Sequence, residues 1–546
     1  MTLGAVGRAL VSCLAGVVLS VALLNSHVLP LGDLARDDLG GDRGHWVWNL
    51  WHGAESIAAG RNPYRAAETY HPLGTSLAKH TYALGFFPVT LAVRAWRGDD
   101  LYPIYAYRIN TLLAFALAWA LAMAAARRLG ADAIPAAAAA TGYAFSAFFT
   151  QHVPHLNILG GAILLPGLTL IALWLLDTPT RARACTAAAL WAAGVYLSEL
   201  ALLAYLALLV ATSAGLWVPE TRGALREAAR KLGARGLALA GLAFALVMTP
   251  FGLSWLEAGG HAPKARASYL WNANAAGFFV PDPTQTPLYE PTPLADLNRL
   301  VSKGIGGREV FLGYPLLALG ILGVRATPRG RRAVVVSVGA VFLVLSLGPT
   351  LKVFGTNTGV PLPYLALMEL PPFDLARTPV RYVSVVMWCG ACLYAAGLTR
   401  VARAASRRWR PWAGAGLALA ALALSAGEGY VEGPETERFV PPPELSRLRP
   451  GAVVNFPLRA FDGHAAFFQI FHRRPIVTGC VARRSREQVA QIERIGELFD
   501  SDTGAFVAEM TRLGVGTAIM SPGAPRDLAS RLQGTPIEVL DLRAFP

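Results

Sequence analysis

Charged residues are scarce in this chain. Aspartate, glutamate, lysine and arginine make up only 15% of its 546 residues, whereas an ordinary soluble domain carries about 25%. With 54% hydrophobic residues and a mean hydropathy of +0.41, the composition excludes a disordered, a collagenous or a plain cytosolic protein. The class that remains is a membrane protein with several transmembrane helices.

Cysteine is scarce as well. Four of the five cysteines fall inside apolar runs, where a thiol behaves as a small hydrophobic group, and no disulfide framework is implied; the five are Cys13, Cys185, Cys389, Cys392 and Cys480. The chain also lacks a glycine-rich phosphate fingerprint. The first apolar run, about residues 8–29, continues past Cys13 and favours a membrane span over the alternative of a cleaved signal peptide.

Basic residues outnumber acidic ones, and the net charge is +14. An even spread of this charge would suggest nucleic acid as a partner. The arginines instead lie in short clusters between apolar runs, which is the pattern that orients membrane spans. Nucleic acid is therefore not an expected partner.

Apolar stretches long enough to cross a bilayer, about 17 to 25 residues each, recur along the chain. The run 182–217 is too long for one span, and Ser198-Glu199 in its middle predicts two short spans that meet with Glu199 near the membrane face. We therefore expect about eleven transmembrane helices. The other stretches are 8–29, 105–126, 133–150, 155–177, 234–252, 310–324, 333–349, 380–399 and 411–427.

The arginine clusters orient these spans. Each cluster marks the cytoplasmic side, and together they place the N-terminus in the cytoplasm and the C-terminus outside. A full span at Tyr82 to Trp96 would invert this order, so we expect a helix in the outer interface there. The clusters are Arg127-Arg128, Arg181 with Arg183, Arg222 to Arg235, Arg325 to Arg332, and Arg400 to Arg410.

Two further regions complete the expected organisation. The first external loop, residues 30–104, should hold two membrane-parallel helices, because apolar residues recur at helical spacing around Trp51 and tryptophans at positions 46, 48 and 51 suit the headgroup level. Residues 1–427 then form the transmembrane domain. Residues 428–546 alternate short β-rich runs with helical stretches and predict a small extracytoplasmic α/β domain.

The first external loop contains the strongest candidate site for chemistry. A carboxylate at the membrane surface beside basic and aromatic groups can act as a general base. Asp42 is the first candidate, with Asp37 and Asp38 behind it and His45 and His52 beside it. The alternative is that Asp42 is only the N-cap of the helix that follows.

Arg377 and Arg381 stand on the external side, where the positive-inside rule would not place them. Four residues apart, they can point the same way, and guanidinium groups suit a phosphate or pyrophosphate. The alternatives are an ion pair with Asp374 or Glu369, or contact with lipid headgroups.

The next external turn contains His152, His155 and Asn157, which we expect to bind a polar substrate. Pro154 breaks the helix there, so a metal site formed by the two histidines is weakly supported. Glu199 is an ionisable group at the end of an apolar hairpin, which indicates a binding role or, alternatively, a helix cap.

Aromatic and charged residues in two external loops add candidates for binding a sugar phosphate. Tyr64, His71 and Lys79 lie in the first loop, and Arg308 and Glu309 lie in the loop 253–309. Aromatic faces stack on sugars and cations meet phosphate. The alternative is that most of them only build the loops.

This arrangement resembles the GT-C superfamily of integral membrane glycosyltransferases. The resemblance covers residues 1 to about 427, and its matching stretch is Gly41-Asp42-Arg43-Gly44-His45-Trp46 in the first loop. More narrowly, the chain looks like a bacterial branch of that superfamily. The segments that carry this likeness are 152–157, 346–349, 361–364 and 377–381.

The resemblance implies a protein of the bacterial inner membrane that takes a sugar from a polyprenyl-phosphate or pyrophosphate carrier. The acceptor would be an extracytoplasmic glycan, lipid or protein, and Asp42 would be the catalytic base. No cofactor is implied with certainty, and a divalent metal ion stays open. The alternatives are a transporter or flippase for a lipid-linked saccharide and a membrane scaffold without catalysis.

Overall fold

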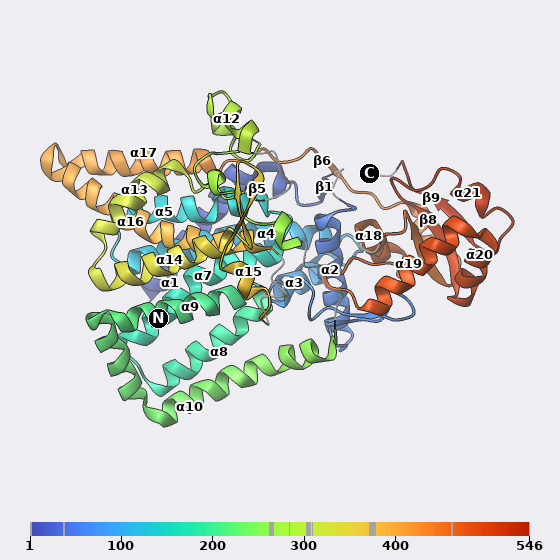
Figure 1. Cartoon of the computed structure of the whole chain (residues 1–546), viewed down its shortest axis with the longest axis horizontal. Helices are drawn as coiled ribbons and strands as arrows, with labels where there is room; N and C mark the ends of the chain where they lie inside the picture. The colour runs from blue at the N-terminus through green and yellow to red at the C-terminus, as the bar shows by residue number, and fades with distance from the viewer. Residues whose placement is uncertain are drawn as a thin grey trace. The chain divides into compact units, whose positions relative to one another are not determined.

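The computed structural model describes residues 3–35, 39–260, 267–282, 284–301, 307, 309–370, 378–459 and 462–544. The chain divides into two compact units (Figure 1). Unit 1 comprises Met1–Val28, Thr111–Met248 and Lys264–Gly433. Unit 2 comprises Leu29–Asn110, Thr249–Pro263 and Pro434–Pro546, so the first loop and the C-terminal residues share one compact unit.

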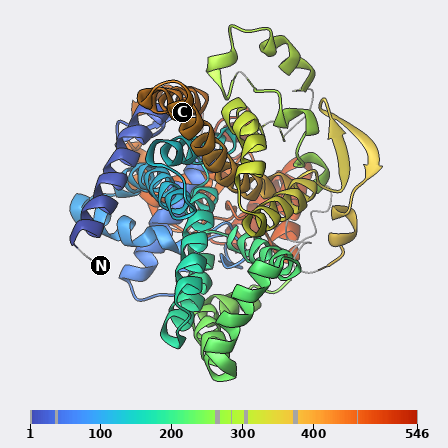
Figure 2. The same ribbon diagram turned by 90° about the vertical axis from the view of Figure 1, so that its left-hand side faces the viewer.

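Unit 1 is a bundle of helices, seen nearly end-on in Figure 2. A helix lies at each stretch that the sequence predicts as a span. The helices wholly or mostly in this unit are α1 (Leu3–Leu24), α4 (Tyr102–Arg128), α5 (Ala133–Ala144), α6 (Ala147–Gln151), α7 (Leu156–Asp177), α8 (Arg181–Leu197), α9 (Ala201–Trp217), α10 (Pro219–Glu257), α13 (Tyr314–Ala326), α14 (Arg329–Ser346), α16 (Val383–Arg408) and α17 (Pro411–Gly429).

In the described part of the chain, six segments are long and apolar enough to cross a membrane, so the predicted number of about eleven is not confirmed. The predicted break at Ser198-Glu199 is confirmed, because α8 ends at Leu197 and α9 begins at Ala201. The six segments are Ala9–His27, Tyr102–Arg128, Ala133–Gln151, Leu156–Asp177, Pro219–Glu257 and Pro379–Arg408.

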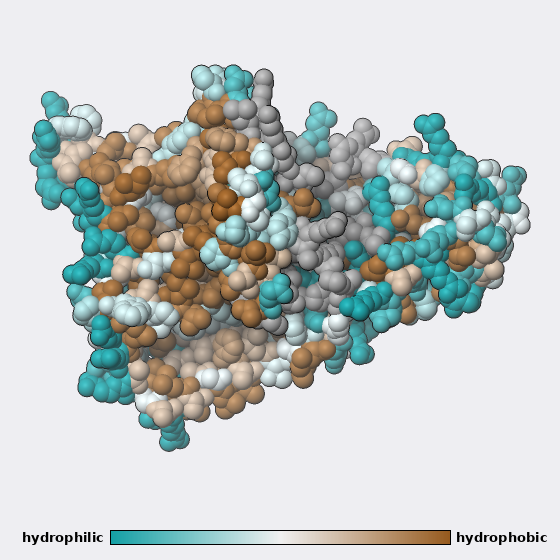
Figure 3. Space-filling view, in the orientation of Figure 1, coloured by the Kyte–Doolittle hydropathy of each residue, from teal (hydrophilic) through white to brown (hydrophobic). Residues whose placement is uncertain are grey.

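The outer surface of these helices is apolar. Large side chains such as Leu10, Leu246 and Ile321 are more than half exposed, and Figure 3 shows brown apolar residues along the helix flanks of unit 1, with teal hydrophilic residues at their left-hand ends. An apolar surface of this extent is unstable in water. It is the surface that lipid would cover, which agrees with a membrane protein.

Glycines allow α13 and α16 to approach backbone to backbone. A Cβ added at Gly323 would lie 1.9 Å from the carbonyl oxygen of Leu393, and one at Gly397 would lie 2.0 Å from that of Leu319. Small residues at such contacts are what hold transmembrane helices together, because van der Waals packing replaces the hydrophobic effect in lipid.

The remaining elements of unit 1 connect the helices. Strands β4 and β5 pair antiparallel, with Thr350 opposite Pro361. The short connecting elements are α11 (Ala267–Leu270), α12 (Leu294–Val301), β4 (Thr350–Val353), β5 (Thr356–Pro361) and α15 (Tyr364–Leu367).

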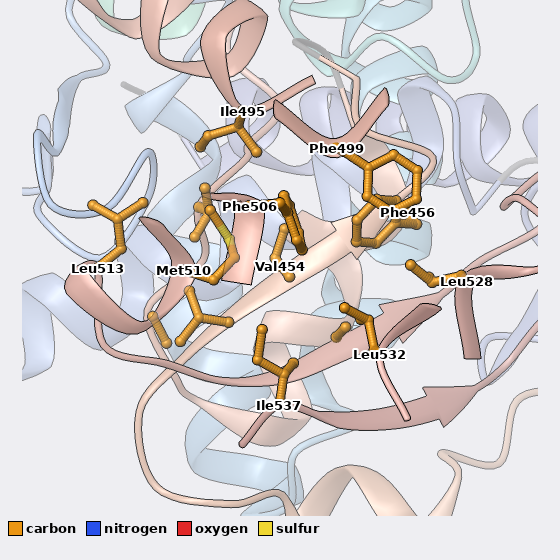
Figure 4. Close-up of a cluster of buried hydrophobic side chains, with 14 of the residues drawn as sticks. Val454, Phe456, Ile495, Phe499, Phe506, Met510, Leu513, Leu528, Leu532 and Ile537 are labelled. Carbon is orange, nitrogen blue, oxygen red and sulfur yellow. The ribbon is translucent and has the colours of Figure 1, made fainter. Parts of the chain in front are cut away.

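The C-terminal part of unit 2 is built on a parallel sheet in the order β7-β8-β9. Its strands are β7 (Ala452–Phe456), β8 (Val515–Met520) and β9 (Glu538–Asp541). Helices α19 (Arg486–Ser501) and α20 (Thr503–Arg512) cover one face, and Figure 4 shows Val454, Phe499 and Phe506 pointing into their shared core. The remaining helices here are α18 (Gly463–His472) and α21 (Leu528–Arg531).

The first loop packs onto this sheet domain within unit 2. Strand β1 (Asp33–Ala35) pairs antiparallel with β6 (Thr436–Arg438), and Thr69 bridges Ile476, which in turn bridges Val453 of β7. The other elements of the loop are α2 (Asp42–Ala58), β2 (Arg65–Ala66), β3 (Thr75–Ser76) and α3 (Phe87–Arg97). With 11 residues, α3 is too short to span a bilayer.

Helix α2 differs from its expected place on the membrane surface. Trp46 and Trp48 are each only 1% exposed, and His45, Asn49 and Ser56 on the polar face of the helix are buried as well. The indole Nε1 of Trp48 donates a hydrogen bond of 2.8 Å to Gln469 Oε1 in α18. The expectation that these tryptophans face lipid headgroups is therefore wrong, because both faces of the helix pack inside unit 2.

Candidate functional site

Asp42 stands in the first turn of α2. The residue that caps this helix is Gly41, whose backbone is extended, so the alternative that Asp42 is the N-cap is wrong. Asp42 is half-buried. Burial raises the pKa of the nearby Cys480 thiol well above its usual range, and the charges of Asp42 and Asp462 act in the same direction. The thiol therefore stays protonated beside the Asp42 carboxylate.

His45, one turn farther along α2, forms a buried pair with His80 of the first loop. Ala482 N–H donates 3.0 Å to His80 Nδ1, so the other nitrogen of a neutral His80 ring carries the proton. That nitrogen, His80 Nε2, donates a hydrogen bond of 2.5 Å to His45 Nε2. His45 Nε2 also accepts a hydrogen bond of 3.0 Å from the Asn49 side-chain amide. These partners fix both tautomers and tie the first loop to the C-terminal domain.

The other first-loop candidates divide between packing and a cavity. The ring of His52 stacks on Trp48 with centroids 5.1 Å apart, and burial, followed by the charge of Arg61, lowers its pKa to about 4. The ring of Tyr64 lies edge-on to those of Tyr82 and Phe251. His71 is half-exposed, and its backbone carbonyl accepts a hydrogen bond from Gln491.

Lys79 and Tyr64 line a cavity of about 540 Å³ in unit 2. The Lys79 amine donates to the Gly259 carbonyl and lies 4.4 Å from the centre of the Trp255 ring. Arg65 and Arg483 add positive charge to the lining, while Glu257 and Glu487 add negative charge. Arg65 and Glu257 lie 3.8 Å apart and pair with each other, so the lining is polar and carries both signs of charge.

Three of the predicted residues meet in unit 1 around Glu199. The side-chain amide of Asn157 donates 3.0 Å to Glu199 Oε1, and Arg381 Nη1 forms an ion pair with the same oxygen. Ser198 donates to the Asn157 carbonyl and accepts from the N–H of Leu200. The polar break between α8 and α9 therefore fixes Glu199, which in turn holds Arg381 in place.

His152 and His155 lie beside each other, with ring centroids 5.4 Å apart. A hydrogen bond of 2.6 Å joins His152 Nδ1 to the Phe148 carbonyl oxygen. Since a carbonyl can only accept, Nδ1 carries the proton, and Nε2 of the neutral ring is left as an acceptor. Across the described ranges no three His, Cys, Asp or Glu side chains gather as a metal site. The backbone of its own turn therefore fixes the tautomer of the His152 ring.

Five predicted residues remain. Glu309 is buried, and Lys352 lies close enough to feel its charge. Burial lowers the pKa of Lys352, and Glu309 partly reverses this shift. Asp37, Asp38, Arg308 and Arg377 lie outside the described residues.

The C-terminal contribution to these sites was missed at the level of sequence. Arg483 and Gln488 line the cavity, and Ala482 fixes the histidine pair. A signal was present, because Arg483, Arg484 and Arg486 form a basic cluster on a segment predicted to be external. The same departure from the positive-inside rule had singled out Arg381.

No protein-family model and no curated protein matches the chain. Its fold is similar to a structure of the oligosaccharyltransferase of Archaeoglobus fulgidus that is tethered to an acceptor peptide containing an NVT sequon by a disulfide bond. This likeness has 12% sequence identity and a TM-score of 0.50, and it covers 93% of this chain and 68% of that one.

A second structure of the same enzyme, in complex with Zn and sulfate, also shares 12% identity. The TM-score is 0.49, and the likeness covers 86% of this chain and 62% of that one, so the chain spans less than two thirds of that relative. The likeness with the TM-score of 0.50 shows that this chain shares the fold of that oligosaccharyltransferase.

Proposed function

We propose that this chain is a membrane glycosyltransferase that moves a sugar from a polyprenyl-phosphate or pyrophosphate carrier to an extracytoplasmic acceptor. The observation that carries the proposal is the fold, which follows that of an oligosaccharyltransferase over 93% of the chain. That relative spans more residues than this chain, so the donor and acceptor named here are proposed from chemistry and not taken from it.

Asp42 is the proposed general base. Its carboxylate takes the proton of the acceptor hydroxyl as the hydroxyl oxygen attacks the anomeric carbon of the sugar. The bond between that carbon and the carrier phosphate breaks, and the carrier leaves with the electron pair. The place of Asp42 in the first turn of α2, within the first loop that the GT-C resemblance singles out, supports this role.

Arg381 is the proposed ligand of the carrier phosphate. A guanidinium group remains charged at every working pH and binds carboxylate and phosphate oxygens with the same planar fork. Glu199 and Asn157 hold the side chain in one direction. Such positioning by neighbouring side chains is what a binding group needs to meet a charged leaving group.

Transfer of label from radiolabelled polyprenyl-phosphate sugars tests the proposal, in membranes that contain wild type or Asp42→Asn. We expect the variant to lose transfer by about 10²- to 10⁴-fold, the usual contribution of a general base. Asp33→Asn is the matched control, since it makes the same change in the same loop, at a residue whose backbone pairs with Arg438, and should keep wild-type transfer.

Two outcomes would overturn parts of the proposal. Full transfer by Asp42→Asn would remove Asp42 as the base, and Asp37→Asn and Asp38→Asn would then identify the carboxylate responsible. No transfer by wild type, together with faster crossing of lipid-linked sugar than in control membranes, would replace the enzyme with a flippase.

A further inference from the structure

One face of α16 changes from apolar to basic along its length. Its residues at helical spacing are Cys392, Ala396, Thr399, Arg403 and Arg407, and all five line one hollow of about 420 Å³ in unit 1. The ends of α4, α13 and α14 form its other walls. The hollow is therefore a groove that α16 lines with an apolar part and a basic part.

The groove is long and reaches deep into the bundle. Cys392 and Arg407 are 15 residues apart in one helix, a rise of about 22 Å. The deep part is lined by Leu393, Ala395 and Ala396. The basic part lies at the end of α16 that the positive-inside rule assigns to the cytoplasm. The groove thus extends from the middle of an apolar helix to the level of lipid headgroups.

Four arginines line the basic part, and no acidic residue lines this groove. Arg331 donates 2.9 Å to the Leu129 carbonyl, and Arg403 forms two bonds of 2.8 Å to the Asp132 carboxylate beside the groove. Arg400 and Arg407 are the other two. One carboxylate does not balance four cations, so the rim suits an anion.

A second hollow of about 520 Å³ adjoins the same arginines. It shares Arg403 and Arg407 with the groove, and its apolar lining comes from α5 and α17, including Ile134 and Ala418. Apolar hollows therefore flank Arg403 and Arg407. A small soluble anion would fill neither of them.

We propose that the groove binds one anionic phospholipid of the cytoplasmic leaflet. The lipid phosphate meets Arg400 and Arg407, one acyl chain follows α16 toward Cys392, and the second chain enters the hollow beside Ala418. Anionic lipids are enriched in that leaflet, and basic pockets between transmembrane helices are suited to their headgroups. The proposal does not depend on glycosyl transfer.

The test uses the full chain purified in detergent, with phosphatidylglycerol, phosphatidylcholine of the same acyl chains, or soluble glycerol phosphate added. Binding is measured by native mass spectrometry and by the shift in Tm. We expect phosphatidylglycerol to bind and raise Tm, and the other two to do neither. An equal effect of glycerol phosphate would show that the site binds a soluble phosphate and not a lipid. An equal effect of phosphatidylcholine would show that the site does not select an anionic headgroup.

Variants separate the two parts of the groove. Arg400→Gln/Arg407→Gln should bind phosphatidylglycerol about 30-fold more weakly, since each arginine near an anionic headgroup contributes about fivefold. Ala396→Leu fills the apolar part without a change of charge and should also weaken binding. The matched control is Arg408→Gln/Arg410→Gln, at the last residue of α16 and the N-cap of α17. Both residues lie outside the groove lining, and this variant should bind as wild type does.

Two results would contradict the proposal. An equal loss of phosphatidylglycerol binding in the control and in Arg400→Gln/Arg407→Gln would show that binding depends only on the overall charge of the helix end. Unchanged binding in Ala396→Leu would show that no acyl chain enters the groove. Elution volume in gel filtration and Tm without lipid establish that each variant is folded.

Discussion

Glu199 connects three segments of unit 1 through one carboxylate. It accepts from Asn157 at the start of α7 and pairs with Arg381 before α16, and the Arg381 and Glu199 side chains are only 18% and 22% exposed. Glu199→Gln keeps the shape but leaves the Arg381 charge uncompensated. We expect the free energy of unfolding of unit 1 to fall by about 1 to 3 kcal/mol, a value between those of exposed and of buried ion pairs. Thermal unfolding in detergent measures this change.

The control for this variant is Glu227→Gln. Glu227 pairs with Arg230 and Lys231 on the exposed part of α10, where ion pairs contribute about 0 to 1 kcal/mol. Equal losses in the two variants would show that the network around Glu199 adds nothing beyond a surface charge.

Two tryptophans of α2 offer a matched pair of substitutions. Trp46 and Trp48 are equally buried, but only Trp48 donates to Gln469, whereas Trp46 Nε1 has no partner among the described residues. Trp48→Phe leaves a buried Gln469 oxygen without its donor, so we expect it to cost about 1 to 3 kcal/mol more than Trp46→Phe. Urea unfolding followed by tryptophan fluorescence measures the difference, and a greater loss in Trp46→Phe would contradict the prediction.

At the scale of elements, the contact between α13 and α16 depends on glycine. Gly323→Ala and Gly397→Ala would each place a methyl group within about 2 Å of a carbonyl oxygen of the facing helix. Because both neighbours are backbone atoms, the helices must move apart. We expect the free energy of unfolding of each variant to fall by about 1 to 3 kcal/mol, the usual cost of overpacking. The measurement is the matching fall in Tm in detergent.

Gly416→Ala in α17 is the control, since an added Cβ there meets nothing within 4 Å. Alanine favours the helix over glycine by about 0.5 to 1 kcal/mol, so this variant should be as stable as wild type or more so. The prediction fails if all three glycines tolerate alanine equally.

At the scale of the whole molecule, buried histidines make unit 2 sensitive to acid. Burial lowers the pKa of His52 to about 4 and that of His472 to about 3, against about 6.5 in an unfolded chain. The unfolded state therefore binds more protons, and stability falls as pH drops from about 6.5 toward 4. Asp462, whose pKa burial raises to about 6, acts in the opposite direction, whereas His464, whose pKa burial also lowers, adds to the acid sensitivity.

His52→Phe isolates one of these residues, because phenylalanine keeps the stacking on Trp48 and does not titrate. Between pH 7 and pH 4, the free energy of unfolding of the variant should fall by about 3 kcal/mol less than that of wild type. The His52 pKa differs between the folded and the unfolded state, and each unit of difference corresponds to 1.36 kcal/mol. Chemical unfolding at both pH values gives the comparison. An identical loss in wild type and variant would show that His52 does not contribute to the acid sensitivity.

The sequence by itself determined the membrane class, the positions of the helices of unit 1 and the break at Ser198-Glu199. These features depend on composition and on apolar runs of bilayer length, which are local properties of the chain. Four short β-rich runs in residues 428–546 also predict strands, because such runs are local as well. Those near 452, 515 and 537 form β7, β8 and β9, whereas the run 475–478 forms only isolated bridges at Ile476.

Only the tertiary structure decided which residues meet. The polar face of α2 resembles a surface in the sequence, yet it is buried: Trp48 of this helix bonds Gln469, 421 residues later, and His45 bonds His80, which Ala482 holds. Glu199 and Arg381 are separated by 182 residues and meet because α9 and α16 lie in one bundle. Contacts between distant segments depend on packing, and no pattern within a short stretch of sequence records the partner.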